Sequence, residues 1–202
     1  MRNWKSKLAG AVAALVIGSV GANAEGIKII DQSEYTGQEA TDVIGALMQP
    51  INPFITGAAQ TTTSITQIGE NNFATSSVEG TSSLSLIEQS GTRNRAVQAI
   101  EGHNSALLLV QGGTNNNVLQ ASRGDNNFQL VGVSGQNNNV GFVQVGDNLA
   151  GVLDVRGSTN STVIAVQTPQ SGNYMMPTGL RGLQNTAVVI VPGRMYVIPV
   201  NR

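Results

Sequence analysis

Glutamine and asparagine side chains recur at fixed spacing along this chain. Their amide groups are the recurring side chains with the most capacity for specific interactions. Gln67, Gln89 and Gln111 lie 22 residues apart. An asparagine stands five positions after each 22-residue anchor, and the step lengthens by three residues before the last one; the series is Asn72, Asn94, Asn116, Asn138, Asn160 and Asn185. Because an amide both donates and accepts hydrogen bonds, this spacing predicts rows of amides that bond to one another.

Residues for other chemistry are scarce, which excludes most enzyme classes. The chain has no cysteine, so a disulfide framework, a thiolate metal site and a cysteine nucleophile are excluded. Its one histidine, His103, and most carboxylates after residue 60 stand at or near expected turns, where we interpret them as solvated groups. The formal net charge of -1 does not suit a nucleic-acid binder. We therefore predict that the chain has no catalytic residues and no cofactor or metal site. We also predict that it binds neither nucleic acid nor a small-molecule substrate.

Glycines mark the same repeat and divide each unit into two halves. One series stands two positions after each anchor and comprises Gly69, Gly91, Gly113, Gly135, Gly157 and Gly182. A second series follows 11 residues later and comprises Gly80, Gly102, Gly124 and Gly146. Two residue types at two offsets in consecutive units indicate a true repeat. Each 22-residue unit is therefore expected to run strand, arch, strand, arch, with glycine supplying positive φ in the arches.

Within each half, every second residue is an amide, a hydroxyl or an apolar side chain. Such residues share one face of a strand, and we expect them to point inward between two facing sheets. The sets in the first halves are Ser83, Ser85, Ile87 and Gln89, then Ser105, Leu107, Leu109 and Gln111, then Asn127, Gln129, Val131 and Val133. Those in the second halves are Asn94, Ala96, Gln98 and Ile100, then Asn116, Val118, Gln120 and Ser122, then Asn138, Val140, Phe142 and Gln144.

A buried amide is costly when it is alone, but stacked units can satisfy it. Units that stack at about 4.7 Å place identical positions above one another, so each amide can donate to one neighbour and accept from the other. The sequence therefore predicts an all-β fold, a β-solenoid of about six stacked strand-arch-strand rungs with amyloid-like cross-β spacing.

The repeat occupies residues 61–191, and different segments flank it. Arg2, Lys5 and Lys7 precede an apolar run over residues 8–20, and residues 22–24 read Ala-Asn-Ala, which together predict a secretory signal over residues 1–24. The run is too short to span a bilayer, so we expect export through the inner membrane to the cell surface or beyond. Residues 25–60 are expected to serve in targeting or capping, with a helix over 36–48, and residues 192–202 to form a tail or short strand.

The pattern Ser-x5-Gln-x-Gly-x2-Asn-x-Ala is met in full by Ser83, Gln89, Gly91, Asn94 and Ala96. It resembles the curlin repeat of curli, the functional-amyloid fibres of bacteria. The resemblance covers about two thirds of the chain, although the later units lose the glutamine. It implies a structural subunit that self-associates into extracellular fibres for surface adhesion and biofilm formation. It also implies two partners, a second curlin-like subunit and an outer-membrane secretion apparatus.

Two departures from the curlin pattern bear on the type of subunit. Residues 25–60 lack the Gly-, Asn- and Gln-rich composition that addresses the major curlin to its secretion pore. The fading of the anchor glutamine is also more like a minor, nucleating or accessory subunit, and the sequence leaves open which of these applies.

Two binding functions compete with the fibre. An ice-binding solenoid would present a threonine ladder, whereas threonine clusters only at residues 61–63 and does not recur at the 22-residue step. A monomeric β-solenoid adhesin with capped ends is the stronger alternative, and only the chain ends separate it from a fibre subunit. Prolines surround the sixth unit at positions 169, 177, 192 and 199. Because proline cannot donate to a strand ladder, we expect residues 61–122 to be the self-assembling part and the C-terminal end to be slower or closed.

Overall fold

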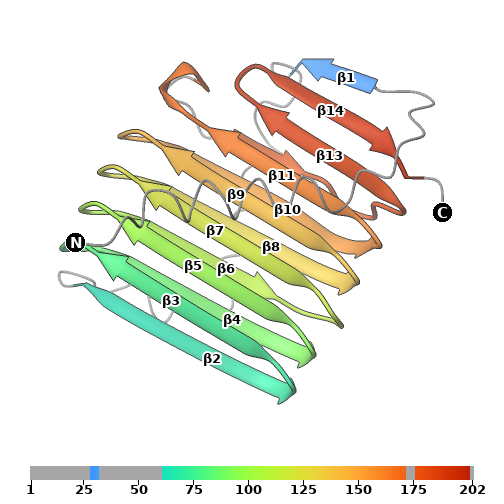
Figure 1. Ribbon diagram of the computed structural model, residues 1–202, viewed down its shortest axis with the longest axis horizontal. Coiled ribbons are helices and arrows are strands. Elements are labelled where there is room, and N and C mark those ends of the chain that lie inside the picture. The colour runs from blue at the N-terminus through green and yellow to red at the C-terminus, as the bar shows by residue number, and fades with distance from the viewer. Residues whose placement is uncertain (1–27, 32–60, 172–175, 201–202) are drawn as a thin grey trace, which may run out of the picture.

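A computed structural model describes residues 28–31, 61–171 and 176–200, and these form a β-solenoid of about six turns. Two sheets face each other, and the chain passes from one to the other at every arch (Figure 1). The six-stranded sheet contains β2 (Thr62–Glu70), β4 (Leu84–Thr92), β6 (Ala106–Gln111), β8 (Phe128–Gln136), β10 (Ala150–Thr159) and β12 (Met176–Gly179). The predicted fold class is confirmed.

The eight-stranded sheet runs alongside and is closed at one end by two further strands. It contains β3 (Phe73–Glu79), β5 (Arg95–Glu101), β7 (Asn117–Arg123), β9 (Asn139–Val145), β11 (Thr162–Gln167), β13 (Thr186–Val191), β14 (Arg194–Pro199) and β1 (Lys28–Asp31). A short 3-10 helix, η2 (Pro169–Ser171), follows β11. The expected signal sequence and the expected helix over 36–48 lie outside the described residues.

The strands of the repeat pair in parallel with their equivalents one rung away. Gln67 lies opposite Gln89, and Arg95 lies opposite Asn117, each 22 residues along. This register follows from the topology, because the chain visits each sheet once per turn and returns to the same sheet one repeat later. Identical sequence positions are therefore stacked.

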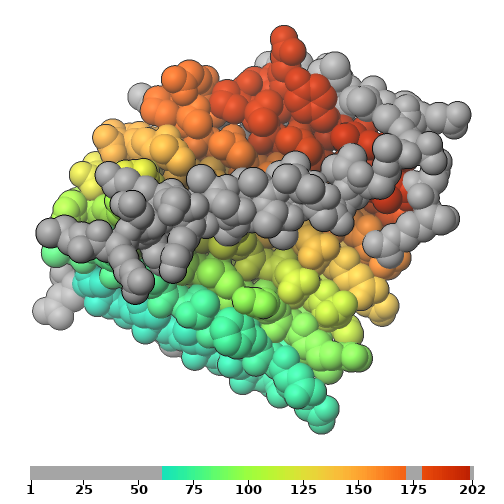
Figure 2. Space-filling model, in the orientation of Figure 1, coloured from blue at the N-terminus to red at the C-terminus, as the bar shows by residue number. Residues whose placement is uncertain are grey.

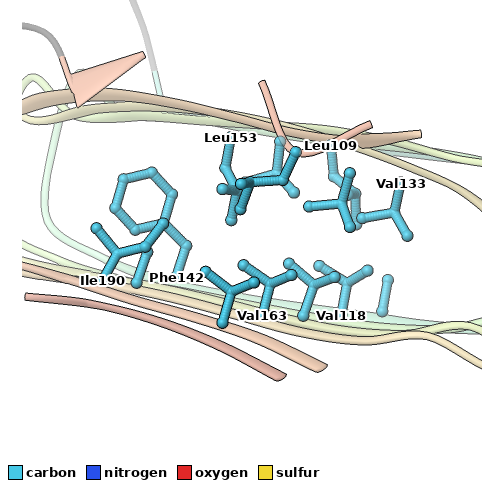
Figure 3. Close-up of a cluster of buried hydrophobic side chains, with 14 of the residues drawn as sticks. Leu109, Val118, Val133, Phe142, Leu153, Val163 and Ile190 are labelled. Atoms are coloured by element: carbon cyan, nitrogen blue, oxygen red, sulfur yellow. The ribbon is translucent and has the colours of Figure 1, made fainter. Parts of the chain in front are cut away.

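The core lies between the two sheets and is built from the alternate residues that the sequence predicts. Ile87, Leu109 and Val131 form a column on the six-stranded sheet, and each is 0% exposed. Figure 3 shows Leu109 and Leu153 facing Val118 and Val163 across the gap between the sheets. Because the side chains of neighbouring rungs stack in these columns, the core continues along the solenoid.

The C-terminal end departs from the parallel repeat. β14 pairs antiparallel with β13, and β1 pairs antiparallel with β14. The region expected to be a tail or short strand thus contributes a strand to the sheet, with Met195 buried in the core. Figure 2 shows this end in red and the first rung, in cyan, at the opposite end of the molecule.

The arch glycines are required because successive arches approach closely. A Cβ atom built on Gly69, Gly91 or Gly113 would lie 2.0 to 2.1 Å from the carbonyl oxygen of the next arch, and their φ values are 110°, 104° and 89°. Side chains other than glycine are strained at these angles. Both the short distance between stacked arches and the positive φ therefore require glycine at these positions.

Two of the predicted arch glycines, Gly157 and Gly182, do not belong to this row. β10 has one residue more than β8, so that Val155 pairs with Val133 but Ser158 pairs with Gly135. Ser158 therefore occupies the position expected for Gly157. No atom lies within 4 Å of a Cβ built on Gly182. The fixed offset fails here because the extra residue shifts every later position.

The difference between the two kinds of glycine predicts different costs for alanine. Gly182→Ala places a side chain at φ 68° in open space, and we expect it to lower the free energy of unfolding by about 1–2 kcal/mol. Gly91→Ala adds overlap with the next arch, and we expect a loss of about 3–5 kcal/mol. Urea titration of the two variants measures both values, and equal losses would mean that the arches are not held at this separation.

Candidate interaction site: amide rows and an open first rung

A row of glutamines runs through the first three rungs, as the spacing predicts. The Nε2 of Gln67 donates to the Oε1 of Gln89 at 2.6 Å, and the Nε2 of Gln89 donates to the Oε1 of Gln111 at 2.7 Å. The row ends there because Val133 takes the next position, and the Nε2 of Gln111 turns to the carbonyl oxygen of Asn116. The two buried amides of this row, Gln89 and Gln111, are thus hydrogen-bonded to a neighbouring rung or to the backbone.

Further glutamine pairs lie on the second half of the repeat; Gln98, Gln120 and Gln144 were predicted to point inward, but neither Gln167 nor the pairing was predicted. Gln98 donates to Gln120 at 2.7 Å, and Gln144 donates to Gln167 at 2.8 Å. The signal was present in the sequence, since these pairs are 22 and 23 residues apart. Gln98 also accepts a hydrogen bond from the Oγ of Ser85, which joins the two sheets.

The asparagines act mainly on the backbone of the next arch. The Nδ2 of Asn94 donates to the carbonyl oxygen of Gly113 at 2.9 Å, and its Oδ1 accepts from the backbone N–H of Asn116 at 3.1 Å. Asn72, Asn116 and Asn138 make the same pair of bonds to their own next rungs. Each of these side chains therefore forms hydrogen bonds with two backbone groups of the following rung.

At the opposite arch, the backbone of the next rung is bound in the same way by the side chains of Ser83, Ser105 and Asn127. The Oγ of Ser83 donates to the carbonyl oxygen of Gly102 and accepts from the backbone N–H of Ser105. The Nδ2 of Asn127 donates to the carbonyl oxygen of Gly146 at 2.7 Å. The serine of the repeat pattern is thus the counterpart of its asparagine in the other half of the rung.

Asn160 and Asn185 were expected in the inner asparagine row, but the structure places them in an outer one. They follow Asn115 and Asn137, and all four have positive φ. Each of the first three donates its Nδ2 to the Oδ1 of the next, over 2.8 to 3.3 Å. The inner position above Asn138 belongs instead to Ser161. The extra residue of β10 is the cause of this displacement as well.

The arch side chains that the sequence analysis interpreted as solvated also link the rungs. His103 accepts from the backbone N–H of Thr81 through its Nδ1, and its own backbone N–H donates to Asp125. The backbone N–H of Asp125 donates in turn to Asp147. This third kind of row was missed because its residue types differ from rung to rung.

In the first rung, the side chains that begin the core column and the glutamine row are exposed to solvent. Within the described residues, β2 pairs only with β4, and β3 pairs only with β5. Ile65 stacks on Ile87 yet is 40% exposed, and Gln67, the first member of the glutamine row, is also exposed. The core column and the glutamine row therefore end at an uncovered surface, which is the candidate site for binding another chain.

An ion cluster with a buried carboxylate and two partly exposed arginines joins two rungs near the other end. Asp154 has no exposed side-chain surface, and it accepts from Arg156 at 2.7 and 2.9 Å and from Arg181. Stacking brings the two arginines together, and the carboxylate between them offsets part of their positive charge. Burial alone raises the pKa of Asp154, but the hydrogen bonds and charges of Arg156 and Arg181 outweigh it and hold the pKa below its ordinary value of 3.8.

Comparison with known proteins adds no assignment. No protein-family model, curated protein or solved structure matches this chain. Among the residues that the structure describes, no helix has the length and apolarity needed to cross a membrane, and no group of three or more His, Cys, Asp or Glu side chains could hold a metal ion. The assignment of the candidate site therefore depends on the geometry of the first rung alone.

The glutamine row predicts a cost for removing its middle member. Gln89→Ala deprives the buried Oε1 of Gln111 of its donor, and we expect the free energy of unfolding to fall by about 1–3 kcal/mol. The control is Arg93→Ala at an exposed position of the next arch, which we expect to change stability by less than about 0.5 kcal/mol. Urea titration separates the two, and similar losses would contradict the inward assignment of the row.

The ion cluster predicts sensitivity to acid. Because the pKa of Asp154 is lower in the folded than in the unfolded chain, its stabilising contribution is complete above the ordinary pKa of 3.8 and is lost as the pH falls through the folded value. We expect Asp154→Asn to lose about 2 kcal/mol at neutral pH and to lose less than the wild type on acidification. Urea titrations at neutral and acidic pH, with the exposed Glu79→Gln as control, measure this; unchanged stability of Asp154→Asn at neutral pH would contradict it.

Proposed function

We propose that this chain is a structural subunit of extracellular curli-like amyloid fibres, which mediate surface adhesion and biofilm formation. The observation that carries the proposal is the open first rung. β2 and β3 have the pairing groups of the interior rungs, but within the described residues each has a neighbour on one side only. Open strand edges of this kind are templates for further strands.

The free edge of β2 has a defined set of donors. The backbone N–H of Thr62 points toward β4, since it donates to the carbonyl oxygen of Ser83. Successive residues of a strand direct their N–H groups to alternate sides, so those of Thr63, Ile65 and Gln67 point to the free edge. A strand that adds there in register also completes the column of Ile65 and the row of Gln67.

The two ends of the subunit are unlike, which supports a nucleating or minor role. The eight-stranded sheet ends in antiparallel strands, and β12, at the end of the six-stranded sheet, is a four-residue strand that contains Pro177. Because proline weakens pairing at an edge, we expect strands to add faster at the first rung than at the C-terminal end. The partner that adds at the first rung is another copy or a second curlin-like subunit, after export through an outer-membrane secretion apparatus.

A monomeric adhesin with capped ends is the second candidate. The antiparallel strands β14 and β1 favour it, since they interrupt the parallel repeat at one end. It requires a comparable cap at the first rung, where Ile65 of the core column is exposed. The assembly state of the purified chain decides between the two candidates.

The proposed function predicts that the mature chain, residues 25–202, forms fibres from dilute solution. We expect a diffraction reflection near 4.7 Å and binding of amyloid dyes. Light scattering over several days follows the assembly. A chain that stays monomeric throughout would overturn the fibre proposal in favour of the capped adhesin.

A substitution at the free edge tests where the fibre grows. Thr63→Pro removes an N–H that points away from β4, so the ladder within the chain is kept while addition is blocked. We expect elongation to slow at least about tenfold, the equivalent of 1.4 kcal/mol in a barrier. Thr63→Ala is the matched control and should elongate like the wild type. Equal rates for the two variants would place growth at another surface.

A further inference from the structure

The two sheets end at different levels of the stack. Each parallel rung places one strand in each sheet, from β2 and β3 in the first rung to β12 and β13 in the last. Within the described residues the six-stranded sheet stops at β12, whereas the eight-stranded sheet continues through β14 and β1 (Figure 1). At the C-terminal end, therefore, two strands of one sheet have no counterparts in the other.

β14 lies where the next rung of the repeat would place a strand. Val163 and Val188 stand at successive positions of one inward column of the eight-stranded sheet. Val197 of β14 lies opposite Val188, and Met195 lies opposite Ile190. Met195 belongs to the core cluster, and Val197 packs against that cluster. β14 therefore covers both the backbone edge of β13 and the core of the last parallel rung.

A second copy of the chain cannot continue the repeat at this end while β14 is in place. In the register of the interior rungs, its β3 would pair with β13 and its β2 would pair with β12. Because one rung contributes a strand to each sheet, the two pairings must form together. β14 already pairs with all six residues of β13, from Thr186 to Val191. β14 and an incoming β3 therefore compete for the same edge.

The outer edge of β1 does not offer an equivalent place. β14 is antiparallel to β13 and β1 is antiparallel to β14, so β1 runs in the direction of the repeat strands. An incoming β3 on β1 would set its own β2 three strand spacings, about 14 Å, from β12. The six-stranded sheet would then be interrupted, because neighbouring strands pair at about 4.8 Å. Addition in the register of the repeat thus requires the edge of β13.

β14 is held less firmly than the strands of the parallel repeat. Its outer neighbour, β1, pairs with it over only four residues, Lys28–Asp31, whereas β5 and β7 pair over seven. Just after β14, the backbone N–H of Val200 donates to the carbonyl oxygen of Asn185. A turn at Pro192 and Gly193 joins β14 to β13, so β14 can leave without moving any rung. Peripheral elements of this kind open at a lower free energy than core strands.

We propose that the edge of β13 is a second docking surface for another copy of this chain, and that β14 covers this edge until a copy displaces it. The incoming partner is the first rung of the second copy. In register, its Ala74 and Ser76 take the places of Val197 and Met195 opposite β13. Each addition therefore displaces one β14. This inference rests on the proposed function, because it names the surface that the open first rung meets.

A reversible bridge between β13 and β14 tests the proposal in the mature chain, since the wild type has no cysteine. Val189 and Tyr196 lie opposite each other on these strands, and they alternate with the inward residues. The test variant carries Val189→Cys and Tyr196→Cys. A short bis-methanethiosulfonate links the two thiols, and a reductant releases them. We expect the bridged chain to elongate preformed fibres about tenfold more slowly than the reduced chain.

The matched control applies the same linker to two strands that stay paired in the fibre. Val97 of β5 lies opposite Leu119 of β7, also at outward positions. The control variant carries Val97→Cys and Leu119→Cys, and we expect its bridged and reduced forms to elongate at the same rate. Equal slowing by both bridges would assign the effect to the linker and would overturn the proposal.

A substitution that loosens β14 should have the opposite effect. Met195→Asp places a carboxylate where β14 meets the core, so the closed form becomes less populated. We expect this variant to elongate fibres several-fold faster than the wild type. Tyr196→Asp, at the neighbouring outward position, is the control and should elongate like the wild type. Circular dichroism of both variants checks that the parallel rungs stay folded.

The outcomes distinguish this inference from the proposed function. If the bridged and reduced forms of the test variant elongate at one rate, the docking edge does not lie under β14; this inference fails and the fibre function stands. If the wild type stays monomeric while Met195→Asp assembles, this inference stands and the fibre function of the wild type fails. If neither of them assembles, both fail.

Discussion

Most of the buried amides in this solenoid bond to a neighbouring rung. Gln89 is held between Gln67 and Gln111, and Asn94 fastens the backbone of the arch that contains Gly113. Because all these bonds run between rungs, a slip of one residue in any strand would break the glutamine row and the arch contacts together. The same in-register stacking forces glycine at the arches, where the backbones approach too closely for a Cβ atom. Register, composition and core are consequences of this one constraint.

The parts of the fold that follow from a strict repeat could be predicted from the sequence. Alternation and the 22-residue step together place Ser85, Ile87 and Gln98 inside, and the structure buries all three. The prediction failed from Gly157 onward, because a fixed offset cannot detect the extra residue in β10. The antiparallel pairing of β14 depends on which edge is free when the repeat ends, and the sequence holds no local signal for it. The second cluster of buried residues, which contains Leu86, Leu108 and Leu130, was not predicted, because only the inward residues of each strand were considered.

The two ends of the molecule differ in how their polar groups are satisfied. Near the C-terminal end, Asp154 forms ion pairs with two stacked arginines, and antiparallel strands follow the last parallel pair. At the first rung, within the described residues, a core column and a glutamine row stop without a covering strand. The repeat by itself is symmetric along the stack; the segments before and after it distinguish one end from the other.

The glutamine rows also have an electrical direction. From Gln67 to Gln111, and again from Gln144 to Gln167, each amide donates toward the higher-numbered rung. The aligned amide dipoles add up, as peptide dipoles do along a helix, and the row presents an acceptor oxygen, that of Gln67, at the first rung. Two copies that met through their first rungs would set oxygen against oxygen. The dipoles therefore favour a head-to-tail neighbour whose last rung presents amide donors, and they disfavour a symmetric pair.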